Sequence, residues 1–294
     1  MFFFAVFISS AAMAQLAVFQ DDEDIITPSF KYDAIKINRV ATLSIQYEYK
    51  PDGAPIKDDG IVKFFRFDSI GRLSESYYTI KESRDNWDTI RTLYYYDDFS
   101  HLIIKRTNEG NFYDTWYYRW YADGKMKKRA HVREAQLATA DNGVFRIGTQ
   151  TVLSADSFAY APYPKQLQRY GYNEENTIYE KTITYLDDRL RMTSRNFHYA
   201  VGWLFSQVDL KYDDQGRINE YTYTGNLNGD IHRKTIVTYD ANGAIASQKL
   251  FDGDKETDNI EYMYDKSTGL ISNQLDRDFV HSMINIARFT YEFR

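Results

Sequence analysis

The feature that most constrains this chain is an alternation of apolar and polar residues that stops at a short polar turn and then resumes. In "QVDLKY" (207–212), Val208, Leu210 and Tyr212 alternate with Gln207, Asp209 and Lys211. A period of two places each set on one face of a β-strand, whereas a helix would need a period of 3.6. The stretch "DDQG" then interrupts the pattern before "RINEYTY" continues it. The alternation predicts two strands joined by a tight reversal.

The interrupting residues are those that reverse a chain. An Asp at the first position can accept hydrogen bonds from backbone amides two residues on, and a Gly near the end can adopt a positive φ without steric cost. The same pairing of Asp and Gly recurs along the sequence. We therefore predict structural turns at Asp68, Gly71, Asp213, Gly216, Asp240, Gly243, Asp265 and Gly269.

The turns repeat at a nearly constant spacing in the second half of the chain. The aromatic anchors there are Tyr185, Tyr212, Tyr239, Tyr264 and Tyr291, which lie about 26 residues apart. Two strands and two turns fill that length, so one repeat is one hairpin. Because a single hairpin cannot bury its aromatic face, successive hairpins must line up. The predicted fold is all-β: a repetitive antiparallel β-hairpin meander, twisted or curled into an extended sheet.

The repeat divides the chain into segments. We predict β-repeats over 45–128 and 169–294, an irregular insertion over 129–168, and a lead-in with a first strand over 15–44. Two departures from the pattern stand out. Tyr172 and Tyr185 lie half a period apart, which predicts a slip in phase, and "YRWYADGKM" is a weaker copy anchored on Tyr121. The apolar "FFFAVFI" followed by Ala12-Met13-Ala14 predicts a signal peptide over 1–14, cleaved near Ala14.

The motif Y-D-x-x-G-R-[LI] resembles the YD-repeat, or Rhs-type, repeats of bacterial secreted and surface proteins. It is strongest at Tyr212–Ile218 and Phe67–Leu73, and weaker at Tyr239–Ile245 and Tyr264–Leu270. The resemblance implies a long antiparallel sheet that curls into a scaffold or shell, in a secreted bacterial setting. It transfers no catalytic residues.

Known reactive patterns do not occur in the sequence. With no cysteine there are no disulfides, thiol nucleophiles or cysteine metal sites, and the five histidines lie far apart. We assign no catalytic residue, no metal ligand and no cofactor, and we expect no enzymatic activity. A net charge of −6 disfavours nucleic acid as a partner. The basic run Lys125–Arg133 is interpreted as a solvated strand and turn.

Aromatic residues carry the functional hypothesis. If one strand face is core, Tyr95, Trp116, Tyr118 and Trp120 point the other way, where they could stack on a sugar or anchor a protein. These four are the candidate ligand-binding residues. The alternative is that both faces are covered and the aromatics are structural. The partner would be a polysaccharide or another surface protein.

Three functions remain open from the sequence. The principal one is a non-enzymatic scaffold or binding protein that is secreted, periplasmic or on the bacterial cell surface. The second is an outer-membrane β-barrel, which suits aromatic-rich strands of this length, although charged stretches such as "RINE" would be costly against lipid. The third is an extracellular carbohydrate-active hydrolase. No apolar stretch is long enough for a transmembrane helix.

Overall fold

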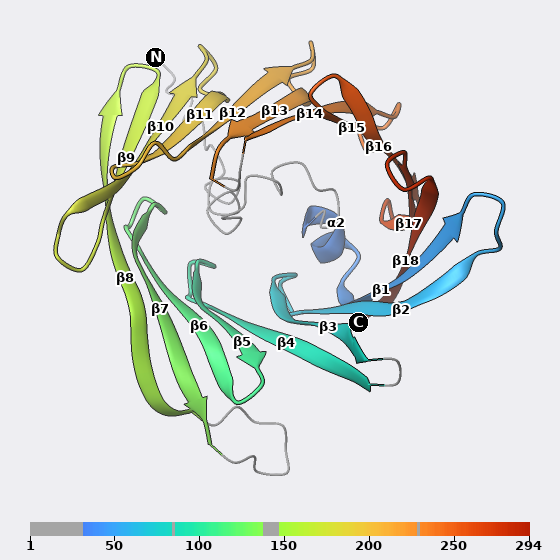
Figure 1. Cartoon of the computed structure of the whole chain (residues 1–294), viewed down its shortest axis with the longest axis horizontal. Helices are drawn as coiled ribbons and strands as arrows, with labels where there is room; N and C mark the ends of the chain where they lie inside the picture. The colour runs from blue at the N-terminus through green and yellow to red at the C-terminus, as the bar shows by residue number, and fades with distance from the viewer. Residues whose placement is uncertain (1–31, 84–85, 138–146, 228–229) are drawn as a thin grey trace, which may run out of the picture.

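The computed structural model of the chain is a ring of antiparallel strands that surrounds one short helix (Figure 1). It describes residues 32–83, 86–137, 147–227 and 230–294; the predicted signal peptide lies outside these. The elements are α2 (Tyr32–Ile37), β1 (Val40–Pro51), β2 (Lys57–Phe67), β3 (Leu73–Ser83), β4 (Asn86–Tyr96), β5 (Leu102–Glu109), β6 (Phe112–Trp120), β7 (Met126–Gln136), β8 (Ile147–Tyr163), β9 (Gln166–Tyr172), β10 (Ile178–Leu186), β11 (Met192–Tyr199), β12 (Phe205–Tyr212), β13 (Ile218–Gly225), β14 (Ile231–Tyr239), β15 (Ile245–Asp252), β16 (Lys255–Tyr264), β17 (Ile271–Asp278) and β18 (Met283–Phe293).

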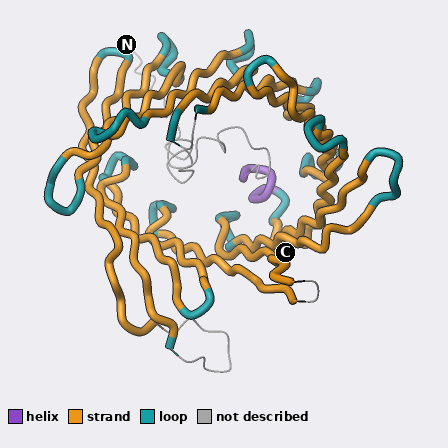
Figure 2. Tube along the Cα trace, in the orientation of Figure 1, coloured by secondary structure: helices purple, strands orange, loops and turns teal. Residues whose placement is uncertain are grey.

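The described strands form a closed barrel. Each pairs antiparallel with the strands before and after it, in an 18-stranded sheet. The first and last strands close the ring, with Leu43 opposite Tyr291 and Tyr47 opposite Ala287. The predicted all-β hairpin meander is confirmed, and the question of open or closed sheet is answered by closure (Figure 2). Closure removes the two free edges that an open meander would expose.

The face that looks into the barrel is identified by α2, which lies inside the ring (Figure 1). Ile35 of this helix belongs to the same buried cluster as Leu43 and Ile45 of β1. Residues directly opposite each other on paired strands share a face. Because Leu43 faces the lumen, its partner Phe65 on β2 also faces the lumen. The same step from each strand to the next assigns the lumen-facing residues around the whole ring.

The predicted sorting of β12 is confirmed. Val208 and Leu210 are buried on the lumen face and pack with Tyr212. Asp209 lies on the opposite face, across from Thr222 of β13. Apolar and aromatic residues therefore face the lumen along this part of the wall, and polar residues face outward.

The predicted turns have the expected chemistry. Asp213 accepts hydrogen bonds from the backbone amides of Gln215 at 3.0 Å and Arg217 at 2.8 Å, and from Arg217 Nε at 2.8 Å. Gly216 has a φ of +81°. Asp68, Asp240 and Asp265 accept from turn amides in the same way, and Gly71, Gly243 and Gly269 also have positive φ.

Successive repeats are joined by contacts between one turn and the next aromatic anchor. The Arg217 guanidinium lies 4.1 Å from the centre of the Tyr239 ring, and the Tyr239 hydroxyl donates to the Ile218 carbonyl at 2.6 Å. Arg72 with Tyr96, and Arg191 with Tyr212, repeat both contacts. The turn residues of the motif thus connect each hairpin to its neighbour, in addition to reversing the chain.

Three details differ from or refine the predictions. Most of 129–168, expected to be irregular, belongs to β7 and β8 of the wall. The half-period spacing between Tyr172 and Tyr185 arises because the two residues precede consecutive turns. The turn after β9 and the turn after β10 lie at opposite ends of the barrel. In β6 the anchor is Trp120, not Tyr121, because the Trp120 indole N–H donates to the Leu102 carbonyl at 2.8 Å.

Candidate functional site

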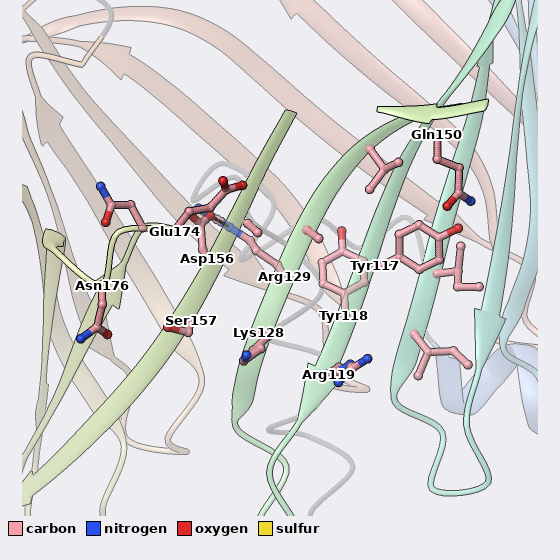
Figure 3. Close-up of a pocket in the computed structure, with 16 residues that line it drawn as sticks. Tyr117, Tyr118, Arg119, Lys128, Arg129, Gln150, Asp156, Ser157, Glu174 and Asn176 are labelled. Carbon is pink, nitrogen blue, oxygen red and sulfur yellow. Dashed lines mark hydrogen bonds and ion pairs between the residues drawn. The ribbon is translucent and has the colours of Figure 1, made fainter. Parts of the chain in front are cut away.

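A groove of about 880 Å³ lies over β5 to β8, beside the turn between β9 and β10 (Figure 3). We call it the outer groove, since most of its lining residues are on the face turned away from the lumen. Small and aliphatic side chains line part of it, among them Ile104, Ala130 and Val132. Tyr117 and Gln150 add polar groups at one end. The mixture suits an extended chain with both apolar and polar groups.

A buried carboxylate stands behind Tyr117 and Gln150. Glu134 is fully buried and accepts from Tyr117 at 2.6 Å, Thr115 at 2.7 Å, Gln150 at 2.9 Å and Arg106 Nε at 2.7 Å. Burial alone would raise the pKa of Glu134, but the hydrogen bonds from Arg106, Tyr117 and Thr115 outweigh it and the pKa is lowered. Glu134 therefore stays ionised and holds the groove wall in place.

Two cations lie at the other end of the groove. Arg119 of β6 is directly opposite Lys128 of β7, and both are exposed. Within the described residues neither forms an ion pair. Like charges directly opposite on neighbouring strands repel, so an anionic group bound between them would relieve that repulsion.

The four predicted aromatic residues do not form one platform. Tyr95 is 41% exposed and faces outward, opposite Ile104. Trp116, Tyr118 and Trp120 face the lumen, on the same side as the core tyrosines. The one-residue difference in the β6 anchor explains the error, because it reverses which face of that strand is core.

The three lumen-facing aromatics are engaged by neighbouring side chains. Trp116 stacks on His131 with ring centres 4.3 Å apart, and Trp120 stacks on His101 at 5.4 Å. Burial raises the pKa of the Tyr118 hydroxyl to about 12. These contacts favour the structural alternative for Trp116 and Trp120 over stacking on a ligand. Tyr118 also lines the outer groove (Figure 3).

Charged groups are buried on the lumen side of β7 to β10. The Phe158 ring has Arg129 at 5.3 Å and Arg169 at 5.1 Å from its centre. Glu180, also buried, pairs with Arg169 at 3.0 Å, and its side chain covers Gly171, where an added Cβ would lie 2.3 Å from Glu180 Cγ. The missing side chain at residue 171 thus makes room for Glu180.

The described residues contain no group of three or more His, Cys, Asp and Glu side chains arranged to hold a metal ion. Among them, no helix has the length and apolar character needed to cross a bilayer. The outer groove is lined by cations, aromatic rings and aliphatic surface, and also by the carboxylates of Asp156 and Glu174. Asp156 pairs with Arg129 at 2.7 Å, and the buried Glu134 behind the groove accepts hydrogen bonds from four side chains.

Sequence reasoning did not identify the outer groove, although part of it was visible. Lys128 lies in the basic run that was interpreted as solvated, and Arg119 belongs to the weaker copy of the repeat, "YRWYADGKM", where it occupies the position of an apolar residue in the other copies. Their opposition across two strands depends on the register of β6 with β7, which the sequence does not state. A charged residue in the place of an expected apolar one was the available signal.

No family model and no curated protein matches the chain. Three similar solved structures are two porin-like proteins and a toxin complex. The porin-like protein of Bacteroides uniformis has a TM-score of 0.38 at 9% identity, covering 87% of this chain and 97% of its own. That of Bacteroides vulgatus has a TM-score of 0.30 at 9% identity, covering 74% and 97%. The Tc holotoxin pore of Photorhabdus luminescens has a TM-score of 0.18 at 11% identity, covering 74% of this chain and 15% of that one. Overlaps this low carry no information about function.

Proposed function

We propose that this protein is a non-enzymatic, secreted or cell-surface β-barrel that works in water and binds an acidic polymer in the outer groove. The observation that supports water as its solvent is the outward face of β10 to β18 and β1. Arg288, in the middle of β18, pairs there with Glu48 of β1 at 3.0 Å, and Lys249 pairs with Glu256 at 3.4 Å. Each Arg or Lys facing lipid at the midplane would cost roughly 2–4 kcal/mol.

The second candidate is an outer-membrane β-barrel. Full closure of the wall favours it over an open scaffold on architecture alone, because closed barrels are the only sheets that span a bilayer. The two candidates differ in where the polar and apolar residues lie. A barrel in lipid has an apolar band outside and a polar lumen, whereas here Val208 and Leu210 face the lumen and Asp209 faces out.

Cell fractionation separates the two candidates. The full chain, expressed in a bacterium with two membranes, is expected in the soluble periplasmic or extracellular fraction and to purify without detergent. Recovery in the outer membrane after an alkaline wash, with folding only in detergent micelles, would refute the water-exposed barrel and establish the second candidate.

The ligand class follows from Arg119 and Lys128. Two unpaired cations beside an aliphatic floor and the Tyr117 ring suit a chain that carries carboxylates on a partly apolar backbone, such as an acidic polysaccharide. Binding would be salt-dependent because both cations are exposed. The groove is also lined by Glu174, which is exposed, and by Asp156, which pairs with Arg129. We assign no catalytic role to either carboxylate, and we propose that the ligand is bound without being cleaved.

Calorimetric titration with polygalacturonate tests this ligand class, with neutral dextran as the comparison polymer. We expect binding to the acidic polymer only, and a loss of about tenfold or more in affinity for the variant Arg119→Ala/Lys128→Ala. The variant Lys211→Ala removes a cation from the opposite part of the wall and serves as the control. Equal binding of both polymers, or an unchanged affinity in the double variant, would refute the acidic-polymer proposal without affecting the barrel's location.

We also propose that the chain is a YD-repeat protein whose repeats have closed into a small barrel. The contacts of Asp213, Arg217 and Tyr239 support this, since they give each residue of the motif a structural role. Exchanging Asp213–Arg217 for the corresponding turn of another protein with a confirmed YD repeat should leave the barrel folded, as judged by circular dichroism and thermal melting.

A further inference from the structure

One strand of the closed barrel has a free edge along half its length. β8 pairs with β7 from Ile147 to Ser157, but its pairing with β9 begins only at Ser157. We call Ile147–Asp156 the projecting segment. In Figure 1 this end of β8 extends beyond the neighbouring β9 and β10. Among the described residues it has one strand neighbour instead of two.

The exposure of the projecting segment agrees with a free edge. Five consecutive residues, Thr149 to Leu153, are exposed, including Val152 at 58%. In a strand with two neighbours, backbone and side chains are covered from both sides. At about 3.3 Å per residue, the segment offers an edge roughly 33 Å long with unpaired backbone donors and acceptors.

The composition of this edge lacks the usual protection against pairing. Soluble proteins blunt exposed edges with Lys, other charges, Pro or a bulge. The sequence "IGTQTVLSA" (147–155) contains no charge and no proline, and it is rich in Thr, Val and Leu. Its irregularities are two register shifts on the β7 side, one near Val152 and one between Ile147 and Gln150. The uncharged composition of 147–155 suits the segment to accept a further strand.

We propose that the projecting segment pairs with the same segment of a second copy, as an antiparallel edge-to-edge dimer. A two-fold axis places one edge against itself. The one charged residue of the segment, Asp156, lies at its end, so an axis near the centre of the segment keeps the two copies of Asp156 apart and brings no like charges together. The pairing would form roughly ten backbone hydrogen bonds. The projecting position lets the second copy approach without displacing β9, whose pairing starts beyond it.

Self-pairing also has a consequence for the outer groove. Gln150 and Ala155 belong both to the projecting segment and to the groove lining. A second strand along β8 would add side chains at the side of the groove that now faces solvent. Dimerisation would thus extend the groove across the two-fold axis and bring two copies of it side by side.

Sedimentation velocity of the purified protein is the first test. We expect a concentration-dependent equilibrium between monomer and dimer in the micromolar range. The variant Gln150→Lys/Val152→Lys should weaken the dimer by about tenfold or more, because charges on the edge repel across the axis. The variant Val201→Lys changes a residue that is 84% exposed on another turn and should leave the dimer intact.

Cysteine cross-linking gives a second and independent readout, because the chain has no cysteine. Single variants Thr149→Cys, Thr151→Cys and Leu153→Cys cover the registers around the proposed axis. At least one should form a disulfide-linked dimer under mild oxidation, while Val201→Cys should not. A wild-type protein that stays monomeric, a dimer unaffected by the two lysines, or cross-linking at residue 201 alone would each overturn the proposal.

Discussion

The barrel contains two arcs that are built by different means. From β10 to β18 the wall repeats one set of contacts, in which each turn begins with an Asp that accepts from turn amides and the next Tyr at a strand end donates to a backbone carbonyl. At two of these turns an Arg held by the Asp also covers that Tyr ring. From β5 to β9 the contacts are individual: Glu134 is buried among four donors, and Phe158 lies between two guanidinium groups. The outer groove and the projecting segment both lie in the second arc. Loss of the repeat thus coincides with the features that can bind a ligand or a partner.

We call β10 to β18 the regular arc and β5 to β9 the irregular arc. The physical reason for the difference is that the polar groups of a repeat find their hydrogen-bond partners within the repeat or in the next one. Each hairpin of the regular arc uses its motif residues for the neighbouring hairpin, so none is left to act on anything else. In the irregular arc, the strands differ in length, and the step between β8 and β9 exposes backbone and forms a concave outer face. The following predictions test how far the two arcs differ, beginning with the largest expected effect.

Removal of Glu134 should have the largest effect on stability. The variant Glu134→Ala leaves the buried Arg106 guanidinium without its carboxylate, and loss of one partner of a buried ion pair costs about 3 kcal/mol. Urea unfolding followed by tryptophan fluorescence should show a clearly lower midpoint. The exposed Glu261 of the regular arc provides the control variant Glu261→Ala, whose midpoint should stay close to that of the wild type. Equal midpoints for the two variants would contradict the conclusion that Glu134 holds this part of the wall in place.

Restoring a side chain at Gly171 should be the next most costly change. In Gly171→Ala the new Cβ would lie 2.3 Å from Glu180 Cγ, so Glu180 must leave its position beside Arg169. Displacing a packed side chain costs roughly 1–3 kcal/mol. Thermal melting of Gly171→Ala measures the loss. The double variant Gly171→Ala/Glu180→Ala removes the overlap but also removes the carboxylate that pairs with Arg169. If Gly171→Ala alone melts at the same temperature as the wild type, Glu180 does not need the space beside residue 171.

Much of the regular arc could be predicted from the sequence. The motif fixes the strand ends at Tyr212 and Tyr239, the turn chemistry at Asp213, and the alternation that sends Val208 inward. These rest on local physics: the period of two, the short reach of an Asp side chain and the freedom of Gly. Closure itself was not predicted, because it depends on Leu43 meeting Tyr291 across almost the whole chain.

The irregular arc was predicted less well for two physical reasons. In β6 the anchor is a Trp, whose indole N–H makes the hydrogen bond that a Tyr hydroxyl makes elsewhere. The sequence placed the anchor one residue later, at Tyr121, and Trp116 and Tyr118 were therefore assigned to the wrong face of the strand. In β7 and β8 the strands lack the aromatic anchor of the repeat, and their pairing contains two register shifts. Whether an Arg and a Lys oppose each other is a matter of register between strands, which no local pattern in this sequence encodes.

A single hydroxyl of the regular arc should have a smaller effect. Tyr239→Phe removes the bond from the Tyr239 hydroxyl to the Ile218 carbonyl, and a hydrogen bond of this kind contributes about 1 kcal/mol. The ring remains, so the contact with Arg217 persists. Urea unfolding should give a modest shift, smaller than that of Glu134→Ala. Tyr95→Phe alters a tyrosine that is exposed on the outward face and should give no measurable shift; a shift as large as that of Tyr239→Phe would remove the distinction between anchor and surface tyrosines.

The last expected effect, no larger than that of Tyr239→Phe, is a gain in stability, at an acid of the regular arc whose ionised form is destabilised. Burial, followed by the nearby Asp258 carboxylate, raises the pKa of Asp276 to about 6. Because the folded protein binds this proton more tightly than the unfolded chain, whose Asp has a pKa of about 3.9, stability falls as the pH rises from about 4 to 6. Above pH 6 the charged form costs about 1 kcal/mol, a value reduced for partial exposure. Asp276→Asn should therefore melt higher than the wild type at neutral pH and equally at about pH 4. The control variant Asp209→Asn, at an outward-facing residue, should show no such pH dependence. If the two variants behave alike, the ionised Asp276 does not destabilise the regular arc.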